Sequence, residues 1–266
     1  MPAFAHCFAH HLAHRQRTLS SVILAAALTT AGATACAQTI GTNASAWALG
    51  GGVAAVDTGY RDIDRDVLAL PLISYENKWI SATVPTLDVK LHTSETLSLR
   101  ARVRYARDGY EAGDSPYLAG MRDRDGGFWL GGAMLWRSTF AQISGEVLHD
   151  ASGKSKSARA RVQAERRFGF GAFGISPRVG VEWVDRKFVD YYYGVRAAEV
   201  RPGRAAYQGD ASASAEAGLR IDYQVAPRQT VFLDLRASRF GSGIKDSPLV
   251  EQSGQTGLSL GYLYRF

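Results

Sequence analysis

The stretch TGLSLGYLYRF, residues 256–266, decides the fold. Every second side chain in it is apolar, aromatic or methyl-bearing: Thr256, Leu258, Leu260, Tyr262, Tyr264 and Phe266. The positions between them are small or charged: Gly257, Ser259, Gly261 and Arg265, with Leu263 as the exception. Because successive side chains of a strand point to opposite faces, this pattern predicts a β-strand with one apolar face and one polar face.

The same alternation recurs along the chain, most clearly in residues 97–105, 158–165, 213–223 and 231–238. A soluble β-sandwich alternates too, but these segments run for about ten residues, the length that a tilted strand needs to cross a bilayer. Aromatic residues also gather near the strand ends, as in the interfacial girdles of membrane barrels. They are Tyr75, Trp79, Tyr105, Phe128, Trp183, Tyr223, Phe240, Tyr262, Tyr264 and Phe266.

Residues 1–37 are predicted to be a cleaved signal peptide. Arg15 and Arg17 precede a short apolar stretch, residues 19–28, and the small residues at 35–37 place the cleavage before Gln38. A buried N-terminal helix is one alternative, and a lipoprotein that begins at Cys36 is another. Cleavage would remove both cysteines of the chain and leave residues 38–266 as one domain without a thiol.

The remaining chain contains no apolar run long enough for a transmembrane helix, and a closed barrel is the other structure that satisfies its backbone inside lipid. With 46% hydrophobic residues the composition is also unlike that of a disordered chain. The formal charge of +6 is spread out rather than gathered into a basic patch, so no nucleic-acid partner is expected. We predict an all-β transmembrane antiparallel barrel in the cell outer membrane, with outer-membrane lipids around it.

Twelve strands are predicted, with ten as the alternative, and the connections between them are short and long in turn. Outer-membrane barrels have short periplasmic turns and long external loops, so the connections 57–65, 107–127, 150–156, 185–210 and 241–253 are placed outside. The weak point is the tight turn at Pro85-Thr86 between two short strands. The predicted strands are 46–56, 66–76, 79–84, 87–92, 97–106, 128–138, 140–149, 157–167, 173–184, 211–223, 229–240 and 254–266.

Charged residues of both signs fall on the predicted inner face. An arginine that faces lipid at the bilayer midplane would cost about 2–4 kcal/mol, whereas inside the barrel it can pair with a carboxylate. The set forms either a charge-selective constriction or an ion-pair network that fills and stiffens the barrel. It consists of Asp88, Lys90, Arg100, Arg102, Arg104, Glu146, Arg159, Arg161, Glu165, Glu182, Glu216, Arg220, Asp222, Asp234 and Arg236.

The sequence offers no catalytic, metal-binding or cofactor-binding residues, and we do not expect an enzyme. Of the histidines, only His92 and His149 follow the signal peptide. His149 has Asp150 and Ser152 nearby, but its parity points it toward lipid or the rim. The glycines at 50–52 and 131–132 lie inside strands and favour bending or close packing over phosphate binding. The tyrosines at 191–193 open the longest loop and are expected at the barrel rim or in a recognition patch.

Phe266 ends the chain on the apolar face of the last strand. A terminal aromatic with apolar partners at every second position resembles the signal that the outer-membrane barrel assembly machinery reads. An ordinary amphipathic strand that happens to end in Phe is the alternative.

Several stretches resemble the MltA-interacting protein (MipA)/OmpV family of outer-membrane proteins. They are WALGGGV at 47–53, LALPLISY at 68–75, DYYYGVRAAE at 190–199 with Tyr207, DSPLV at 246–250, and GYLYRF at 261–266. The resemblance implies an outer-membrane barrel without a catalytic centre. It also implies a scaffold that links a lytic transglycosylase to a penicillin-binding protein during peptidoglycan growth. A narrow charged pore and a surface adhesin acting through the long loops are the alternatives.

Overall fold

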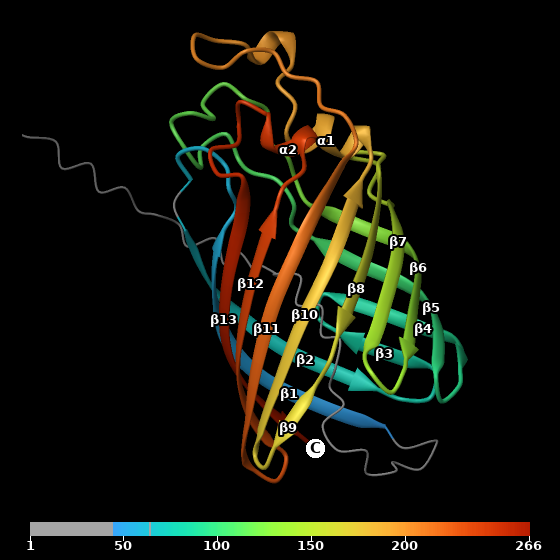
Figure 1. Ribbon diagram of the computed structural model, residues 1–266. Helices are drawn as coiled ribbons and strands as arrows, with labels where there is room; N and C mark the ends of the chain where they lie inside the picture. Colours follow the sequence, from blue (N-terminus) through green and yellow to red (C-terminus); the bar gives the residue numbers. More distant parts are fainter. Residues whose placement is uncertain (1–44, 64) are drawn as a thin grey trace, which may run out of the picture.

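The computed structural model describes residues 45–63 and 65–266. The predicted signal peptide, residues 1–37, and its cleavage point before Gln38 lie outside these residues. Figure 1 shows tilted strands that wrap into a barrel, with the long loops and short helices gathered at one end and the C-terminus at the other. In the described part of the chain no helix is long and apolar enough to cross a membrane.

Every strand of the barrel is antiparallel to its neighbours, and β10 pairs with β11 to close the sheet. A short strand, β9, pairs only with β10, so twelve strands form the wall as predicted. The wall strands are β1 (Ala46–Asp57), β2 (Asp66–Glu76), β3 (Ile80–Thr83), β4 (Thr86–Thr93), β5 (Leu97–Ala106), β6 (Gly127–Arg137), β7 (Gln142–Asp150), β8 (Ala158–Glu165), β10 (Phe173–Val184), β11 (Ser212–Ala226), β12 (Gln229–Arg239) and β13 (Gly254–Arg265). The remaining elements are β9 (Phe168–Phe170), the helices α1 (Arg186–Tyr192) and α2 (Ser242–Lys245), and the 3-10 helix η1 (Ala197–Glu199).

Most strand boundaries lie within two residues of the prediction, and the differences that matter for the wall flank β10. The predicted strand 157–167 ends at Glu165, which pairs with the first residue of β7, Gln142. The chain then resumes as β9, which the prediction had placed in a turn. On the other side of β10, β11 continues to Ala226 through an irregularity in its pairing with β12. The two short strands, β3 and β4, are separate, as predicted.

The alternation of side chains follows the predicted faces. On β13, Leu258 is 44% exposed and Leu260 is 49% exposed, whereas Ser259 between them is 7% exposed. The apolar residues therefore face outward, which is the arrangement of a barrel whose outer surface contacts lipid. One aromatic residue departs from its predicted place, because Phe240 is buried under the loops instead of lying in a girdle.

Two of the strand glycines allow β1 and β13 to approach each other closely. A Cβ atom on Gly50 would overlap the carbonyl oxygen of Tyr262, and one on Gly52 would lie 2.5 Å from the carbonyl oxygen of Leu260. On Gly51 the nearest atom would be 4.0 Å away. Close packing therefore requires glycine only at the inward positions. This agrees with the prediction that the glycines at 50–52 serve bending or close packing and not phosphate binding.

Candidate functional site: a charged lumen beneath a folded cap

The first group of lumen charges is centred on Arg102 of β5. Its Nε and Nη2 atoms donate to the two oxygens of Asp88, each at 2.7 Å, and its Nη1 atom donates to Glu146 on β7 at 2.5 Å. Arg104 also donates to Glu146, at 2.7 Å from Nη1. Asp88, Glu146 and Arg104 are buried, so these bonds are shielded from bulk water.

The second group joins β8 to its neighbours and to the loops. Arg159 donates from Nη2 to Glu182 at 2.6 Å and from Nη1 to Asp108 at 2.8 Å. Its guanidinium also lies 5.0 Å from the ring centre of Trp129. Arg161 donates to Glu216 on β11 at 2.5 Å. Since Asp108 belongs to the loop after β5, this group connects the barrel wall to the loops.

The third group lies nearer the end of the barrel that is opposite the cap and holds the C-terminus. Arg178 on β10 donates from Nη1 to Asp234 on β12 at 2.8 Å. Arg220 donates to Asp222 at 2.7 Å, and Arg167 pairs with the other oxygen of the same carboxylate. The predicted inner set omitted Arg167 and Arg178, although both have the inner parity of the predicted strands 157–167 and 173–184.

Glycines on the intervening strands make room for these long pairs. Arg178 reaches Asp234 across Gly218 of β11, where an added Cβ would lie 2.5 Å from Arg178 Nε. Arg167 likewise passes over Gly174, where a Cβ would overlap its guanidinium. The pairs that Arg102, Arg104, Arg161 and Arg178 form join strands that are adjacent or next but one, so the ion pairs follow the wall from β4 to β12. The opposite wall is lined by small or apolar buried residues, among them Ala48, Ala54, Leu70 and Ser259.

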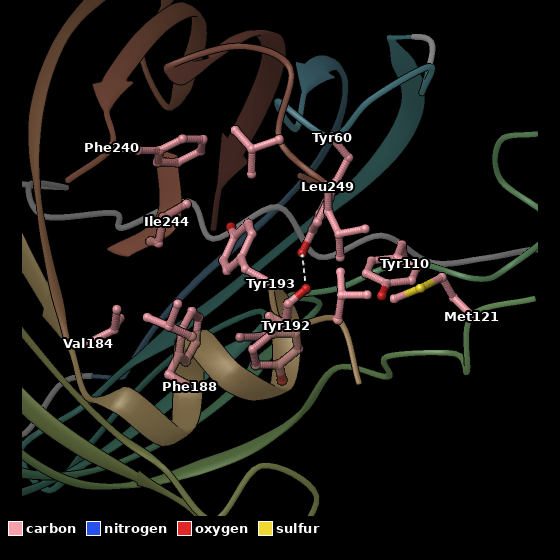
Figure 2. Packing of buried hydrophobic residues seen from close by; sticks show 14 of the residues in the cluster. Tyr60, Tyr110, Met121, Val184, Phe188, Tyr192, Tyr193, Phe240, Ile244 and Leu249 are labelled. Atoms are coloured by element: carbon pink, nitrogen blue, oxygen red, sulfur yellow. Dashed lines mark hydrogen bonds between the residues drawn. The ribbon is translucent and has the colours of Figure 1, made fainter. Parts of the chain in front are cut away.

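The long loops fold together over the mouth of the barrel into a unit that we call the cap, residues 58–63, 65, 107–126, 185–211 and 240–253 of the described chain. Figure 2 shows that side chains from loops far apart in sequence meet in one apolar cluster. Tyr60 stacks on Tyr193 at 5.2 Å between ring centres, and its hydroxyl donates to the carbonyl of Tyr192 at 3.2 Å. Leu118, Val189 and Leu249 are fully buried. Burial of this kind stabilises the cap as a small hydrophobic core.

A buried ion pair holds two of the loops together in the cap. Arg124 Nη2 lies 3.0 Å from both carboxylate oxygens of Glu199, and the backbone N–H groups of Arg122 and Arg196 donate to the same carboxylate. Burial by itself would raise the pKa of Glu199, but these hydrogen bonds and the Arg124 charge lower the pKa below its usual value. Nearby, burial raises the pKa of Tyr110 to about 12.

The prediction for the tyrosine run at 191–193 was wrong in part. Residues 186–192 form α1, whose first turn is capped by the Asp185 side chain accepting from the Phe188 N–H at 2.9 Å. Tyr192 and Tyr193 are buried in the cap core and face neither lipid nor solvent. A sequence signal did exist, since Asp185 is a good N-cap residue followed by apolar residues at 188, 189 and 192.

A cavity of about 490 Å³ lies between the cap and the lumen charges. Its lining includes Arg104, Asp108, Arg159, Glu182 and Tyr193. These four charged residues form ion pairs with one another or with Glu146. Positive and negative charges therefore alternate along this border of the cavity, and neither sign predominates. Such a space suits a small polar solute or water.

All of the inward charges predicted from the sequence lie on the inner face. His149 is exposed on the outer face and His92 lies near a turn at the opposite end from the cap, so the structure does not bring them together. In residues 45–63 and 65–266 no group of three or more His, Cys, Asp or Glu residues is arranged to hold a metal ion.

The fold and its apolar outer surface define the class: the chain is an outer-membrane β-barrel. It belongs to the family of MltA-interacting protein MipA, whose model matches residues 49–266. The expected family membership and outer-membrane location are therefore confirmed. Because outer-membrane barrels have short periplasmic turns and long external loops, we expect the short turns at the periplasmic end and the cap on the outer side.

Curated relatives carry outer-membrane names. The chain is 26% identical to the MltA-interacting protein of Escherichia coli K12, over 83% of this chain and 90% of that protein. It is 24% identical to the putative outer membrane protein YiaT of the same strain, over 84% of this chain and 92% of that protein. It is 22% identical to the outer membrane protein OmpV of Vibrio cholerae, over 77% of this chain and 81% of that protein.

Solved structures of outer-membrane proteins align with most of the chain. The NanC porin aligns with 81% of this chain and 98% of its own, with a TM-score of 0.43 and 6% identity. An outer membrane channel from Pseudomonas putida F1 aligns with 85% of this chain and 96% of its own, with a TM-score of 0.43 and 13% identity.

Proposed function

We propose that this protein is a closed outer-membrane scaffold that docks a lytic transglycosylase, and with it a penicillin-binding protein, at its periplasmic end. The observation that carries the proposal is that the lumen is lined by ion pairs and covered by the cap. Ion pairs line its wall from β4 to β12, and a cap with its own hydrophobic core covers its mouth. A barrel occupied in this way acts through its surfaces. The name of the Escherichia coli relative, MltA-interacting protein, supports a transglycosylase as the partner.

The periplasmic end offers apolar anchors for such a partner even though its turns are short. Phe140, in the turn between β6 and β7, is 75% exposed, and Trp79, beside β3, is 63% exposed. Aromatic side chains of this kind are enriched among the residues that dominate binding energy at interfaces. Turns and rim together would have to supply the roughly 800 Å² per partner of a standard interface.

Pull-down with a purified MltA-type lytic transglycosylase tests the proposal. The barrel should enrich the enzyme over an unrelated barrel of similar size, and Phe140→Ser should weaken that enrichment. Val200→Ser is the matched control, since Val200 is a 47% exposed apolar residue on the cap at the opposite end. Equal recovery of the enzyme with the unrelated barrel would contradict the scaffold role.

A narrow pore is the second candidate, and the charged cavity beneath the cap favours it. Planar-bilayer recording separates the two roles. A scaffold with a sealed lumen should give no discrete conductance steps, whereas a pore should give steps that change when Arg104 or Glu182 is replaced. An adhesin would act through the outer surface of the cap, and exposed cap substitutions such as Val200→Ser would then reduce attachment to surfaces.

The scaffold proposal includes the route to the membrane. We expect the signal peptide, residues 1–37, to be removed before Gln38, and the barrel assembly machinery to recognise the strand that ends in Phe266. N-terminal sequencing of the mature protein tests the first expectation, because a mature chain that begins elsewhere would contradict it.

A further inference from the structure

The lipid-facing wall carries an open depression of about 500 Å³ on β11, β12, β13 and β1. These strands lie side by side in Figure 1. The floor is formed by small outward residues such as Ala217 and Ala237, which pair across β11 and β12. Larger side chains, including Leu235 and Leu258, border it. A strip of small side chains between leucines makes a groove that an extended hydrocarbon chain can fill.

Two arginines stand at the outer margin of this depression. Arg65, from the loop before β2, contributes to its lining. Arg239 lies two residues beyond Ala237 on the same face of β12 and is exposed. Both therefore sit at the end of the groove that is nearer the cap, at the level of the outer head groups.

Arg239 is an exception among the basic residues of the strands. In the described strands, every other arginine and lysine has the parity of the inner face, and most of them bind carboxylates there. Within the described residues, neither Arg65 nor Arg239 forms an ion pair or side-chain hydrogen bond. An outward arginine costs about 0–1 kcal/mol near the interface, far less than at the midplane, so this position is tolerated at the rim and nowhere deeper.

The outward carboxylate at the cap end of β1 already accepts two hydrogen bonds. Asp57, opposite Thr256 at the end of β1, accepts from the Gly59 N–H at 3.1 Å and from Gln252 Nε2 at 3.1 Å. Since neither guanidinium has a carboxylate partner within residues 45–63 and 65–266, both are available to an external anion. The guanidinium fork matches the oxygens of a phosphate group, and such charge-assisted bonds are strong.

We propose that this depression binds an acyl chain of a phosphorylated lipid of the outer leaflet, and that Arg65 and Arg239 bind the phosphate of its head group. The apolar groove and the two cations, which have no ion-pair partner among the described residues, lie at the depth where such a lipid places its acyl chain and its head group. This site is independent of the scaffold role, because it lies on the wall and not at the periplasmic turns.

Native mass spectrometry of the full mature protein, purified from outer membranes in mild detergent, tests the site. The probe is a diphosphorylated, multi-acyl lipid at a fixed ratio to protein, compared with the same lipid after removal of its phosphates. The wild type should retain the phosphorylated form preferentially. Arg65→Gln combined with Arg239→Gln should lower the lipid-bound fraction about tenfold, the equivalent of ~1.4 kcal/mol. Ala237→Trp should fill the groove and give a comparable loss.

The matched control is Lys187→Gln combined with Lys245→Gln, which removes two exposed charges from the cap and should leave lipid retention unchanged. Every changed side chain is exposed, so each variant should keep its heat-modifiable gel mobility, and this readout verifies folding. Equal retention by the double arginine variant and by the control would overturn the proposal, as would equal retention of the dephosphorylated lipid. A lipid-free dimer that Ala237→Trp abolishes would also overturn it, because the depression would then be an interface between two copies.

Discussion

Arg159 of β8 donates a 2.8 Å hydrogen bond to Asp108, and this contact fastens the cap to the barrel wall. The same guanidinium binds Glu182 and lies over the rings of Trp129 and Phe188. One side chain therefore connects the lumen ion pairs, the first turn of α1 and the base of the loop 107–126. The cap and the lumen are coupled through this residue.

Arg159→Ala should destabilise the protein by about 1.5–3 kcal/mol, because it removes charge-assisted hydrogen bonds to the partly buried carboxylates of Glu182 and Asp108. Glu182 would keep only Arg161, at 3.8 Å, as a neighbouring cation. The midpoint of urea unfolding, followed by the heat-modifiable gel shift, measures the loss. Arg159→Lys should recover part of it, since lysine keeps the charge but not the two-sided reach of the guanidinium. Arg186→Ala, at an exposed position on α1, is the control. A wild-type midpoint for Arg159→Ala would contradict the coupling.

The cap should loosen in acid. The pKa of Glu199 is lowered in the folded protein, so its contribution to stability is present above its unfolded pKa of about 4.3 and is lost as the pH falls through the lower folded value. Near-ultraviolet circular dichroism of the tyrosine-rich cap should therefore weaken below about pH 4. Glu199→Gln should weaken the signal already at pH 7 and flatten this acid dependence, whereas Glu95→Gln, in a periplasmic turn, should preserve the wild-type profile. An unchanged acid profile in Glu199→Gln would remove this assignment.

Gly218→Ala should disturb the lumen ion pairs. The new methyl group would lie 2.5 Å from Arg178 Nε and would push the guanidinium away from Asp234. A loss of about 1–3 kcal/mol is expected, the range for overpacking a filled interior. Gly257→Ala is the matched control on the neighbouring inner wall, because its Cβ would meet nothing nearer than 4.0 Å. Urea midpoints of the two variants give the comparison, and equal midpoints would show that Arg178 does not need the space above Gly218.

Leu249→Ala should open the cap without unfolding the barrel. Leu249 is fully buried in the cap core, and truncation at such a site costs about 2–5 kcal/mol. Limited proteolysis of intact protein in detergent should then cut the loops 107–126 and 240–253 faster than in the wild type, while the gel shift of the barrel persists. Val200→Ala, at an exposed cap position, should digest at the wild-type rate. Loss of the gel shift in Leu249→Ala would mean that cap and barrel fold as one unit.

The sequence by itself determined the strands and their faces. Alternation is a local property of extended backbone, so residues 256–266 predict an outward Leu258 and an inward Ser259 without knowledge of any neighbour. The same parity placed Arg102, Glu146 and Asp234 inside the barrel, and the lengths of the connections separated the short turns of one end from the long loops of the other. For that reason the strand number was predicted correctly, and even the short strands β3 and β4 were recognised.

Only the tertiary structure decided which charges meet and what the loops do. Arg178 reaches Asp234 because the stagger of three strands sets them on either side of Gly218, and stagger is a property of the closed sheet. Tyr60 and Tyr193 stack although 133 residues separate them, because the closed wall brings their loops over the same opening. A loop sequence carries no alternation to reveal such a partner, since its buried side chains are selected by contacts that exist only after the barrel has closed.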